Sequence, residues 1–288
     1  MSGSARNGGT WHQEVLARAL AFGEDGRWDE MAAALRDALE ADPDDPYVLG
    51  WLGVAEQELG EDERARERFR SCLAQDPLDP ELLALAGSAL AAWDDPEAEV
   101  ALRAAALSGP DVPVARLQYG AYLVRQGLTA EGLEHLEEAT RLDPEDPVAR
   151  AELGGAFALT GRLDEAVAAM EEALERAPED EWTRTLLGLV LLERGDPDEA
   201  AVELLTASRS APEDLESQAL AALAAAAEGL DSEAQEALYR AEQSAGPGDA
   251  AFLAEIEDAV HAGPDRARAL LRGELAPVAL RDRLAAPL

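Results

Sequence analysis

The chain has 288 residues, and its 60 acidic residues against 24 arginines and no lysine give a formal net charge of −36. A charge of this sign argues against a nucleic-acid partner, because phosphate binding needs clustered cations that displace counterions. It argues equally against adsorption to an anionic lipid surface. The acidity is uneven, since residues 12–263 hold 18 arginines against 57 acidic residues and residues 264–288 hold five against three. We therefore expect an acidic body that ends in a mildly basic segment.

The N-terminal residues, 1–11, are rich in glycine and serine and contain no apolar stretch. We expect a flexible segment there, with no signal peptide. No run approaches the roughly 18 apolar residues of a membrane-spanning helix. The single cysteine, Cys72, excludes an intrachain disulfide and fits a reducing compartment, which favours a cytoplasmic protein. The missing lysine fits either an arginine-favouring genome or adaptation to high salt.

Proline and glycine recur along the chain with the same period of 34 residues, apart from one shortened interval. The prolines are Pro43, Pro77, Pro110, Pro144, Pro178 and Pro212, and the glycines are Gly26, Gly60, Gly127, Gly161, Gly195, Gly229 and Gly263. Two residue types that keep one period predict a helix–turn–helix unit that is copied along the chain and stacked on itself.

Residues 147–180 illustrate how one such repeat folds. Gly161 ends a first helix, as glycine does in the left-handed conformation, and Asp164 can cap a second helix. Pro178 ends that second helix, because proline lacks an amide donor and clashes with the preceding turn. Asp180 can then cap the first helix of the next repeat.

Three Asp–Pro pairs mark the starts of other first helices. They are Asp45–Pro46, Asp79–Pro80 and Asp146–Pro147, each of which places a capping acid before a proline in the first turn. Much of the negative charge is therefore expected at helix N-termini, where the helix dipole favours it.

Several further positions repeat with the same spacing. First helices carry the pairs Leu52–Gly53, Tyr119–Gly120, Leu153–Gly154 and Leu187–Gly188. Second helices carry a small column (Ala65, Ala98, Gly132, Ala166, Ala200, Ala234), a large column (Phe69, Leu102, Leu136, Met170, Leu204, Leu238) and a second small column (Cys72, Ala105, Ala139, Ala173, Ala207, Ala241). In these features the chain resembles the tetratricopeptide repeat family.

The resemblance implies an all-α fold, a right-handed superhelical solenoid of about eight stacked helix–turn–helix repeats. We expect the solenoid over residues 12–274 and a C-terminal capping helix and tail over 275–288. The repeats begin near residues 12, 46, 80, 113, 147, 181, 215 and 249.

Three repeats depart from the pattern. The third is one residue short and has Asp94–Asp95–Pro96 where a turn glycine is expected, which predicts a local irregularity. The first has Arg18–Ala19 in place of the Leu–Gly pair, and the eighth is degenerate. Terminal repeats are expected to differ, because their outer faces meet water.

No catalytic, cofactor-binding or metal-binding constellation is found, and we expect no enzyme. Without lysine there is neither a phosphate-binding loop of the usual kind nor a Schiff-base lysine. His12, His135 and His261 lie far apart and fit no metal-ligand spacing, and His135 is interpreted as a surface residue. Cys72 lies in a packing column, which favours a buried thiol over a nucleophile.

Two groups of arginines could be read as binding sites. Arg64, Arg66, Arg68 and Arg70 alternate along one helix and so share no single face; pairing with Glu61, Glu63 and Glu67 is the favoured interpretation.

Arg116, Arg150 and Arg184 repeat with the period and must form a ladder. A packing role between repeats, with the guanidinium groups paired to loop acids, is favoured over a row that grips a partner's carboxylates.

In the resembling family the first helix of each repeat lines a concave groove that binds proteins or peptides. Carried over, this surface is apolar, with acidic residues such as Glu58 and Glu216 at its edge, which is typical of an interaction site. The partner-binding candidates are Leu16, Leu20, Tyr47, Gly50, Trp51, Val54, Leu85, Leu117, Val124, Leu159, Trp182, Leu186, Leu189 and Leu223.

Tight superhelical winding could instead bury this strip between adjacent first helices. Gly50 and Gly155 would let a partner backbone approach closely. The chain's single asparagine is Asn7, outside the repeats, so the Asn-and-Lys clamp and the Asn ladder of the family cannot be built here.

The sequence thus predicts a non-enzymatic adaptor or scaffold that needs no cofactor. Its partner would be a protein or peptide, an apolar or amphipathic segment with basic flanks. Two alternatives stay open: self-assembly into a homo-oligomer through the basic C-terminal segment (Arg266, Arg268, Arg272, Arg281, Arg283), or a dedicated regulatory subunit of an enzyme.

Overall fold

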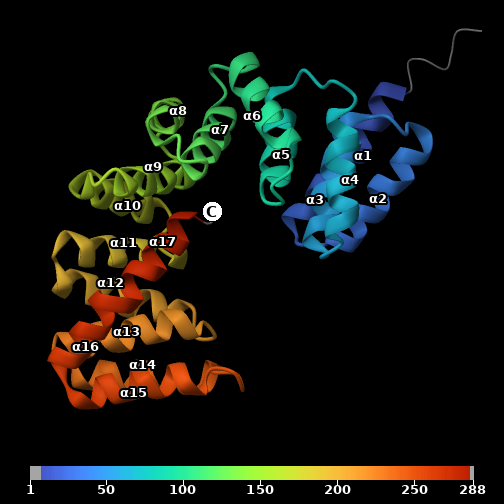
Figure 1. The fold of residues 1–288 in the computed structure, drawn as a ribbon. Helices are drawn as coiled ribbons and strands as arrows, with labels where there is room; N and C mark the ends of the chain where they lie inside the picture. Colours follow the sequence, from blue (N-terminus) through green and yellow to red (C-terminus); the bar gives the residue numbers. More distant parts are fainter. Residues whose placement is uncertain (1–7, 286–288) are drawn as a thin grey trace, which may run out of the picture. The chain divides into compact units, whose positions relative to one another are not determined.

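The protein folds into helical pairs, as the computed structural model shows (Figure 1). It describes residues 8–285, with side chains from Glu14 onward. All the regular structure in this range is helical. The first helices are α1 (Gly8–Glu24), α3 (Pro46–Glu58), α5 (Pro80–Ala91), α7 (Pro113–Arg125), α9 (Pro147–Leu159), α11 (Glu181–Arg194), α13 (Leu215–Ala227) and α15 (Ala250–Ala262). The second helices are α2 (Trp28–Ala41), α4 (Asp62–Leu73), α6 (Glu97–Ser108), α8 (Thr129–Leu142), α10 (Leu163–Arg176), α12 (Pro197–Ser210), α14 (Asp231–Ser244) and α16 (Pro264–Leu270).

The chain does not stop after α16 but continues through a π-helical stretch, η1 (Leu271–Leu275), into α17 (Ala276–Ala285). At the other end, α1 already begins at Gly8, so residues 8–11 are helical and not part of a flexible segment. Residues 1–7 lie outside the described part of the chain, and so does the side chain of His12.

The first helices begin with the capping predicted from the Asp–Pro pairs. The Asp45 carboxylate accepts a hydrogen bond from the backbone N–H of Val48, and Asp79 and Asp146 accept equivalent bonds. Asp180 accepts from the N–H groups of Trp182 and Thr183. These bonds satisfy donors that a helix N-terminus leaves free, and they place negative charge where the helix dipole favours it.

The prediction that Asp164 caps a second helix is wrong. Helix α10 begins at Leu163 after Arg162, without a side-chain cap, so Asp164 lies inside the first turn. Helices α2, α4, α8, α12 and α14 likewise begin without a side-chain cap. Their acidic first-turn residues act through the helix dipole instead.

The periodic glycines all have the positive φ that the sequence predicts, although Gly263 combines it with an extended ψ of −178°. Their φ angles run from 70° at Gly26 to 104° at Gly195. In the shortened third repeat Asp94 takes this place with φ 51°. Aspartate tolerates the conformation better than most L-residues, because its short side chain bonds locally. The third repeat therefore keeps its turn without a glycine.

The predicted columns form the contact between the two helices of a repeat. A Cβ atom at Gly53 would come within 2.8 Å of the Phe69 ring, and one at Gly188 within 2.7 Å of Leu204 Cγ. The glycine of the Leu–Gly pair thus makes room for the large column of the facing helix. All members of the three columns are buried.

The contacts divide the chain into two compact units, Met1–Tyr122 and Leu123–Leu288, which we call the N-terminal and C-terminal units. The boundary falls inside α7, where the sequence predicts an uninterrupted array. Each unit is built from stacked helix pairs.

In the C-terminal unit the last helix returns along the first helices. Helix α16 packs against α13 and α15, η1 against α13, and α17 against α11 and α9 (Figure 1). The π-helical stretch precedes Pro277, whose ring would clash with the carbonyl of Gly273 in a regular helix, and such clashes kink helices. The C-terminal helix thus begins before the predicted residue 275, since α16, η1 and α17 follow one another without a break over residues 264–285.

Arginines of α4 hold the repeats of the N-terminal unit together. Arg66 Nε lies 2.9 Å and Arg70 Nη2 2.6 Å from Oδ2 of Asp95, a buried residue of the next repeat. Arg68 and Arg36 both reach the buried carboxylate of Glu56. Of the predicted local pairs the structure confirms Arg64–Glu61, at 2.8 Å, whereas Arg66, Arg68 and Arg70 pair with Asp95 and Glu56 instead.

The periodic arginines pack between repeats, as the sequence favours, but their partners are proline carbonyls and acids of second helices, and not loop acids. Arg116, Arg150 and Arg184 each donate to the carbonyl of the periodic proline six residues earlier. Arg150 also pairs with Glu172, and Arg184 Nη1 lies 2.7 Å from Glu203. The guanidinium groups thus satisfy backbone acceptors between repeats.

The left-handed turns generate a first prediction. Gly161→Ala should lower the free energy of unfolding by about 1–2 kcal/mol, because an L-side chain disfavours this conformation. The space around Gly161 is open, so no steric clash contributes. Gly273→Ala is the matched control, with equally open space but no left-handed backbone. Urea unfolding measures both variants, and equal losses would contradict the backbone explanation.

A second prediction concerns Asp95. Burial alone would raise the pKa of this carboxyl, but the N–H of Glu97, Arg66 and Arg70 together lower it below its ordinary value. Asp95→Asn should reduce the free energy of unfolding by about 1–3 kcal/mol. The lower part of that range is expected, since the Arg66 and Arg70 side chains are 32% and 46% exposed and stay hydrated.

The same carboxylate predicts a pH dependence. Since the folded-state pKa is depressed, the stabilisation is present above the unfolded pKa of about 4 and is lost as the pH falls through the folded value. The stability gap between wild type and Asp95→Asn should therefore close in acid. Glu63→Gln, at an exposed position of α4, should show almost no gap at any pH. A gap for Asp95→Asn that persists in strong acid would exclude the charge as its cause.

Candidate functional site

The first-helix candidates of the N-terminal unit form a partly open apolar surface. Leu16, Leu20 and Trp51 are half-buried against a core cluster that contains Leu52. Val54 and Leu85 are half-buried against the neighbouring cluster around Phe69. Leu117, by contrast, is buried. The predicted strip is thus buried at Leu117, while Trp51, Val54 and Leu85 keep part of their surface exposed.

Tyr47 is exposed and tied to the next repeat. Its hydroxyl donates to Asp79 Oδ2 at 2.7 Å. This hydrogen bond, together with partial burial and the surrounding carboxylates, raises the pKa of Tyr47 to about 12. The residue is 40% exposed, so Tyr47 presents an apolar face while its hydroxyl bridges to the start of the next first helix.

The expectation that Gly50 admits a partner backbone is wrong. A Cβ atom there would lie 2.7 Å from Leu82 Cδ1 and near the side chains of Cys72 and Leu85. The glycine therefore accommodates the next first helix, α5. Its absent side chain serves the stacking of repeats and leaves no space for a ligand.

In the C-terminal unit the corresponding surface is covered. Leu186 and Leu189 are 0% and 1% exposed, and Leu223 is fully buried as well. Helix α13 is buried almost throughout, from Ser217 to Ala227. The cover is the terminal helix, since α16 lies on α13 and α17 on α11. The sequence does not reveal that the chain's own end occupies part of its predicted groove.

Five candidate residues of this unit meet at α17. Leu284 enters a site formed by Val124, Leu159, Trp182 and Leu186, where it lies against Gly155. A Cβ atom at Gly155 would be 3.4 Å from Leu284 Cδ2. The close approach predicted at Gly155 is therefore made by the chain itself. Leu189, the fifth candidate, lines a second site together with Leu280.

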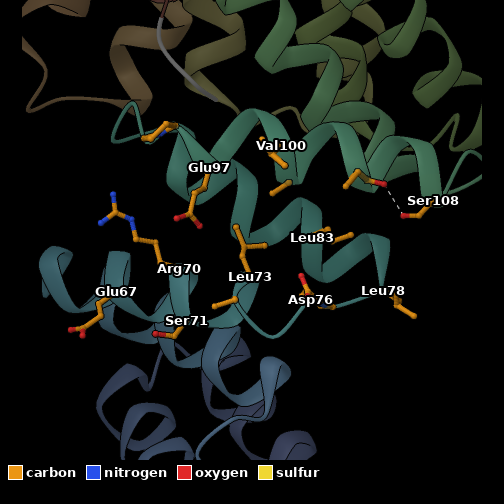
Figure 2. A pocket seen from close by; sticks show the side chains of 15 residues that line it. Glu67, Arg70, Ser71, Leu73, Asp76, Leu78, Leu83, Glu97, Val100 and Ser108 are labelled. Atoms are coloured by element: carbon orange, nitrogen blue, oxygen red, sulfur yellow. Dashed lines mark hydrogen bonds between the residues drawn. The ribbon is translucent and has the colours of Figure 1, made fainter.

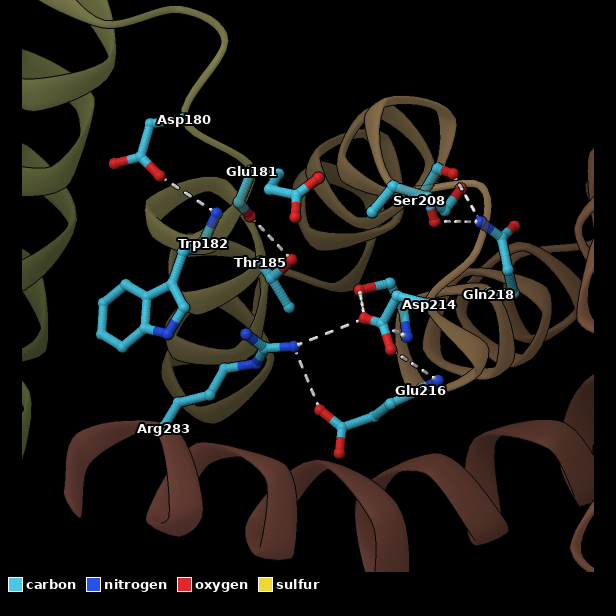
Figure 3. Close-up of polar contacts among 11 residues, drawn as sticks. Asp180, Glu181, Trp182, Thr185, Ser208, Asp214, Glu216, Gln218 and Arg283 are labelled. Carbon is cyan, nitrogen blue, oxygen red and sulfur yellow. Dashed lines mark hydrogen bonds and ion pairs between the residues drawn. The ribbon is translucent and has the colours of Figure 1, made fainter. Parts of the chain in front are cut away.

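An arginine completes the contact (Figure 3). Arg283 Nη2 lies 3.1 Å from Glu216 Oε1 and 4.0 Å from Asp214 Oδ2. Asp214 is also the cap of α13, because its carboxylate accepts the N–H groups of Glu216 and Ser217. Trp182 and Arg283 line the same small pocket (Figure 3). The docked helix thus combines apolar side chains with one cation that faces the acidic start of α13.

A pocket of about 870 Å³ lies elsewhere, on the second-helix side of the N-terminal unit (Figure 2). Leu73, Leu83 and Val100 line it, and Val100 is 61% exposed. Three carboxylates, Glu67, Asp76 and Glu97, also line it, and the one lining arginine, Arg70, is paired with Asp95, so the lining is net acidic (Figure 2). The sequence does not predict this pocket. Two sequence features could have indicated it: apolar Leu78 in the loop between α4 and α5, and apolar Val100 on an exposed face of α6 in the shortened repeat.

Cys72, His135 and His261 are the side chains that the sequence singles out for chemistry. Burial raises the pKa of the Cys72 thiol to about 12, so thiolate formation is disfavoured near neutral pH. His135 is half-buried on α8 and His261 is exposed on α15. Within the part of the chain that the structure describes, no three His, Cys, Asp or Glu side chains are arranged to hold a metal ion. None of the described helices is long and apolar enough to cross a membrane.

Comparisons with known proteins agree with this architecture. One model of the tetratricopeptide repeat matches residues 24–89 and 159–226, and another matches residues 117–181. No curated protein matches the sequence.

Solved structures of repeat proteins resemble the fold. A thermophilic tetratricopeptide repeat protein of Thermus thermophilus matches with a TM-score of 0.52 and 28% identity, over 63% of this chain and 99% of that one. A tetratricopeptide repeat protein from Parabacteroides merdae has a TM-score of 0.60 and 14% identity, over 87% and 98% of the two chains. PilW, a widely conserved type IV pilus biogenesis factor, has a TM-score of 0.61 and 21% identity, over 70% and 94%.

At their identities the last two similarities concern the fold alone. The repeat models together match more than half of the chain. They match it in the helix pairs whose turns, caps and packing columns are described above. The protein therefore belongs to the tetratricopeptide repeat family.

Proposed function

We propose that this protein is a non-enzymatic interaction scaffold whose first-helix surfaces bind apolar or amphipathic segments of partner proteins. The observation that carries the proposal is the accessible apolar strip of the N-terminal unit, formed by Tyr47, Trp51, Val54 and Leu85. An apolar strip with an acidic edge is a typical interaction surface.

The charge of the chain favours partners with basic flanks. Glu24 and Glu58 are exposed at the ends of the N-terminal first helices, and the whole chain carries a net charge of −36. Such a field accelerates the approach of a cationic segment, while buried aromatic contacts supply most of the binding free energy. Trp51 is the strongest anchor by size. The buried, single cysteine fits the cytoplasmic location that we propose.

Self-assembly through the C-terminal segment has less support than partner binding. Arg283 and Arg268, the two C-terminal arginines with the most extensive contacts, bind α13 and its ends within the same chain. An intramolecular contact of this kind leaves those side chains engaged and not free for a neighbouring molecule.

A third prediction tests the proposed surface. Trp51→Ala should weaken partner binding by about 2–4 kcal/mol, the usual loss for an aromatic anchor at an interface centre. The measurement is the set of proteins that the immobilised full chain retains from a lysate of its source organism, identified by mass spectrometry. Leu107→Ala is the matched control, because Leu107 is 76% exposed on a second helix.

Folding must be checked in parallel, since Trp51 also packs against the core cluster of the first two repeats. Circular dichroism should show unchanged helix content for both variants. If folded Trp51→Ala retains the same proteins as wild type, in the same amounts, the proposed surface is not the binding site.

A further inference from the structure

The docked face of α17 is a short amphipathic pattern. Ala276, Ala279, Leu280, Arg283 and Leu284 follow each other at the three- and four-residue spacing of one helix face. Ala276 and Ala279 are buried and the other three are half-buried, while Val278 on the opposite face is 47% exposed. The helix is therefore seated by small residues, two leucines and one arginine.

The terminal helix is anchored firmly at its start. In α16 and η1, Ala267, Leu270 and Leu271 are at most 1% exposed. Arg268 also donates to the carbonyl of Ala227 at the C-terminus of α13, where unsatisfied acceptors and the helix dipole favour a cation. Residues 264–271 are therefore a fixed part of the C-terminal unit.

Helix α17 has no comparable anchor. The members of its seated face that are buried are alanines, which offer little apolar surface. Arg283 lies near the N-terminus of α13, where the dipole opposes a cation, so its attraction depends on Glu216 and Asp214 alone. Those carboxylates are 49% and 44% exposed, and the contact is accordingly screened by salt. The π-helical stretch η1 lies between α16 and α17.

The fit of α17 is also incomplete. A cavity of about 120 Å³ remains between Leu189, Leu192 and the terminal helix, beside Ala276 and Leu280. Arg283 Nε is buried without a hydrogen-bond partner among the described residues. Leucines line this partly open space together with Glu193 and Arg272, and an unfilled space and an unsatisfied donor both weaken an interface. A better-fitting helix could fill the first and avoid the second.

We propose that α17 is a replaceable occupant of the C-terminal unit and that a partner's amphipathic helix binds in its place. The partner helix carries two leucines four residues apart with an arginine directly before the second, the Leu280–Arg283–Leu284 pattern of this chain. This inference rests on the proposed function and names the partner class for the C-terminal unit.

The surface selects for this pattern by three contacts. The second leucine enters the site beside Gly155, between Trp182 and Leu186, and the arginine meets Glu216. A side chain larger than alanine at the Ala276 position would occupy the cavity beside Leu189. Such a partner would bind more tightly than the chain's own helix and displace it.

The fourth prediction uses a fluorescein-labelled peptide of residues 274–288 as the probe and fluorescence anisotropy as the measurement. The full chain should bind it weakly, because α17 already occupies the surface. Leu284→Asp in the full chain should release α17, because a carboxylate loses hydration beside Val124, Leu159 and Trp182, and the nearby Arg125 is already paired with Glu152. That variant should bind the probe about tenfold more tightly than wild type, since the fraction of open surface sets the apparent affinity.

Arg281→Glu is the matched control on the same helix, because Arg281 is 72% exposed and pairs only with the adjacent Asp282 among the described residues. It should leave probe affinity as in wild type. A probe with Arg283→Glu should lose about tenfold in affinity for the released variant. A probe with Ala276→Leu should gain several-fold by filling the cavity.

Hydrogen exchange of the amides of 276–285 reports whether α17 is docked. The proposal expects protection in wild type, and loss of protection in Leu284→Asp or on saturation with the Ala276→Leu probe. Continued protection in both cases would show that α17 is a permanent part of the fold and would overturn the proposal. The proposal would also be overturned if Leu284→Asp did not bind the probe. Light scattering that shows a dimer of this variant would then mean that the open surface binds a second copy of the chain.

The experiments distinguish failure of the proposed N-terminal surface from failure of the proposed replacement of α17. Unchanged partner retention by Trp51→Ala would remove the proposed surface of the N-terminal unit. Probe binding to the released variant would be unaffected by that result, because it concerns the surface around Trp182 and Leu186.

Discussion

Each helix pair in this protein can cover its apolar faces only by packing against the pairs before and after it. This constraint explains the columns of the second helices and the glycines opposite them, because Gly53 and Gly188 let Phe69 and Leu204 close the space between the helices of a pair. It also makes the ends of the array the places where apolar surface is left uncovered. In the C-terminal unit the last helix also turns back along α13 and α11 and covers part of their first-helix surface.

The same constraint organises the charges. Many carboxylates are bound to defined donors: Asp45 and Asp180 cap first helices, and Asp95 and Glu56 join neighbouring helices through arginines. The periodic arginines satisfy the carbonyls of the periodic prolines. Acidity in this protein is therefore partly a structural property, which stabilises helix starts and repeat contacts. The remaining exposed carboxylates give the field that favours basic partners.

In the proposed exchange, α17 and the partner helix bind to the same surface of the C-terminal unit. The residues that would receive a partner, Trp182, Leu186 and Leu189, are those that receive Leu284 and Leu280. A helix that completes the core in this way need not be optimised as tightly as one inside the array, and its alanines, its residual cavity and its unsatisfied Arg283 Nε are consistent with that. The seated face of α17 then serves as a template for the segment that replaces it.

The sequence by itself determined the features that repeat every 34 residues. The left-handed turns, the Asp caps of first helices and the buried columns could be predicted, because each depends on the local chemistry of one repeat and its copy. Only the tertiary structure decided what lies outside the period. Arg66 and Arg70 pair with Asp95, and Leu82 fills the space where a side chain at Gly50 would lie. Leu186 is buried under α17. The sequence spacing of these partners does not predict their contacts. A helix face of alanine, leucine and arginine has the same sequence pattern whether it is exposed to water, bound to a partner or packed on its own chain. Only the tertiary packing distinguishes these three cases.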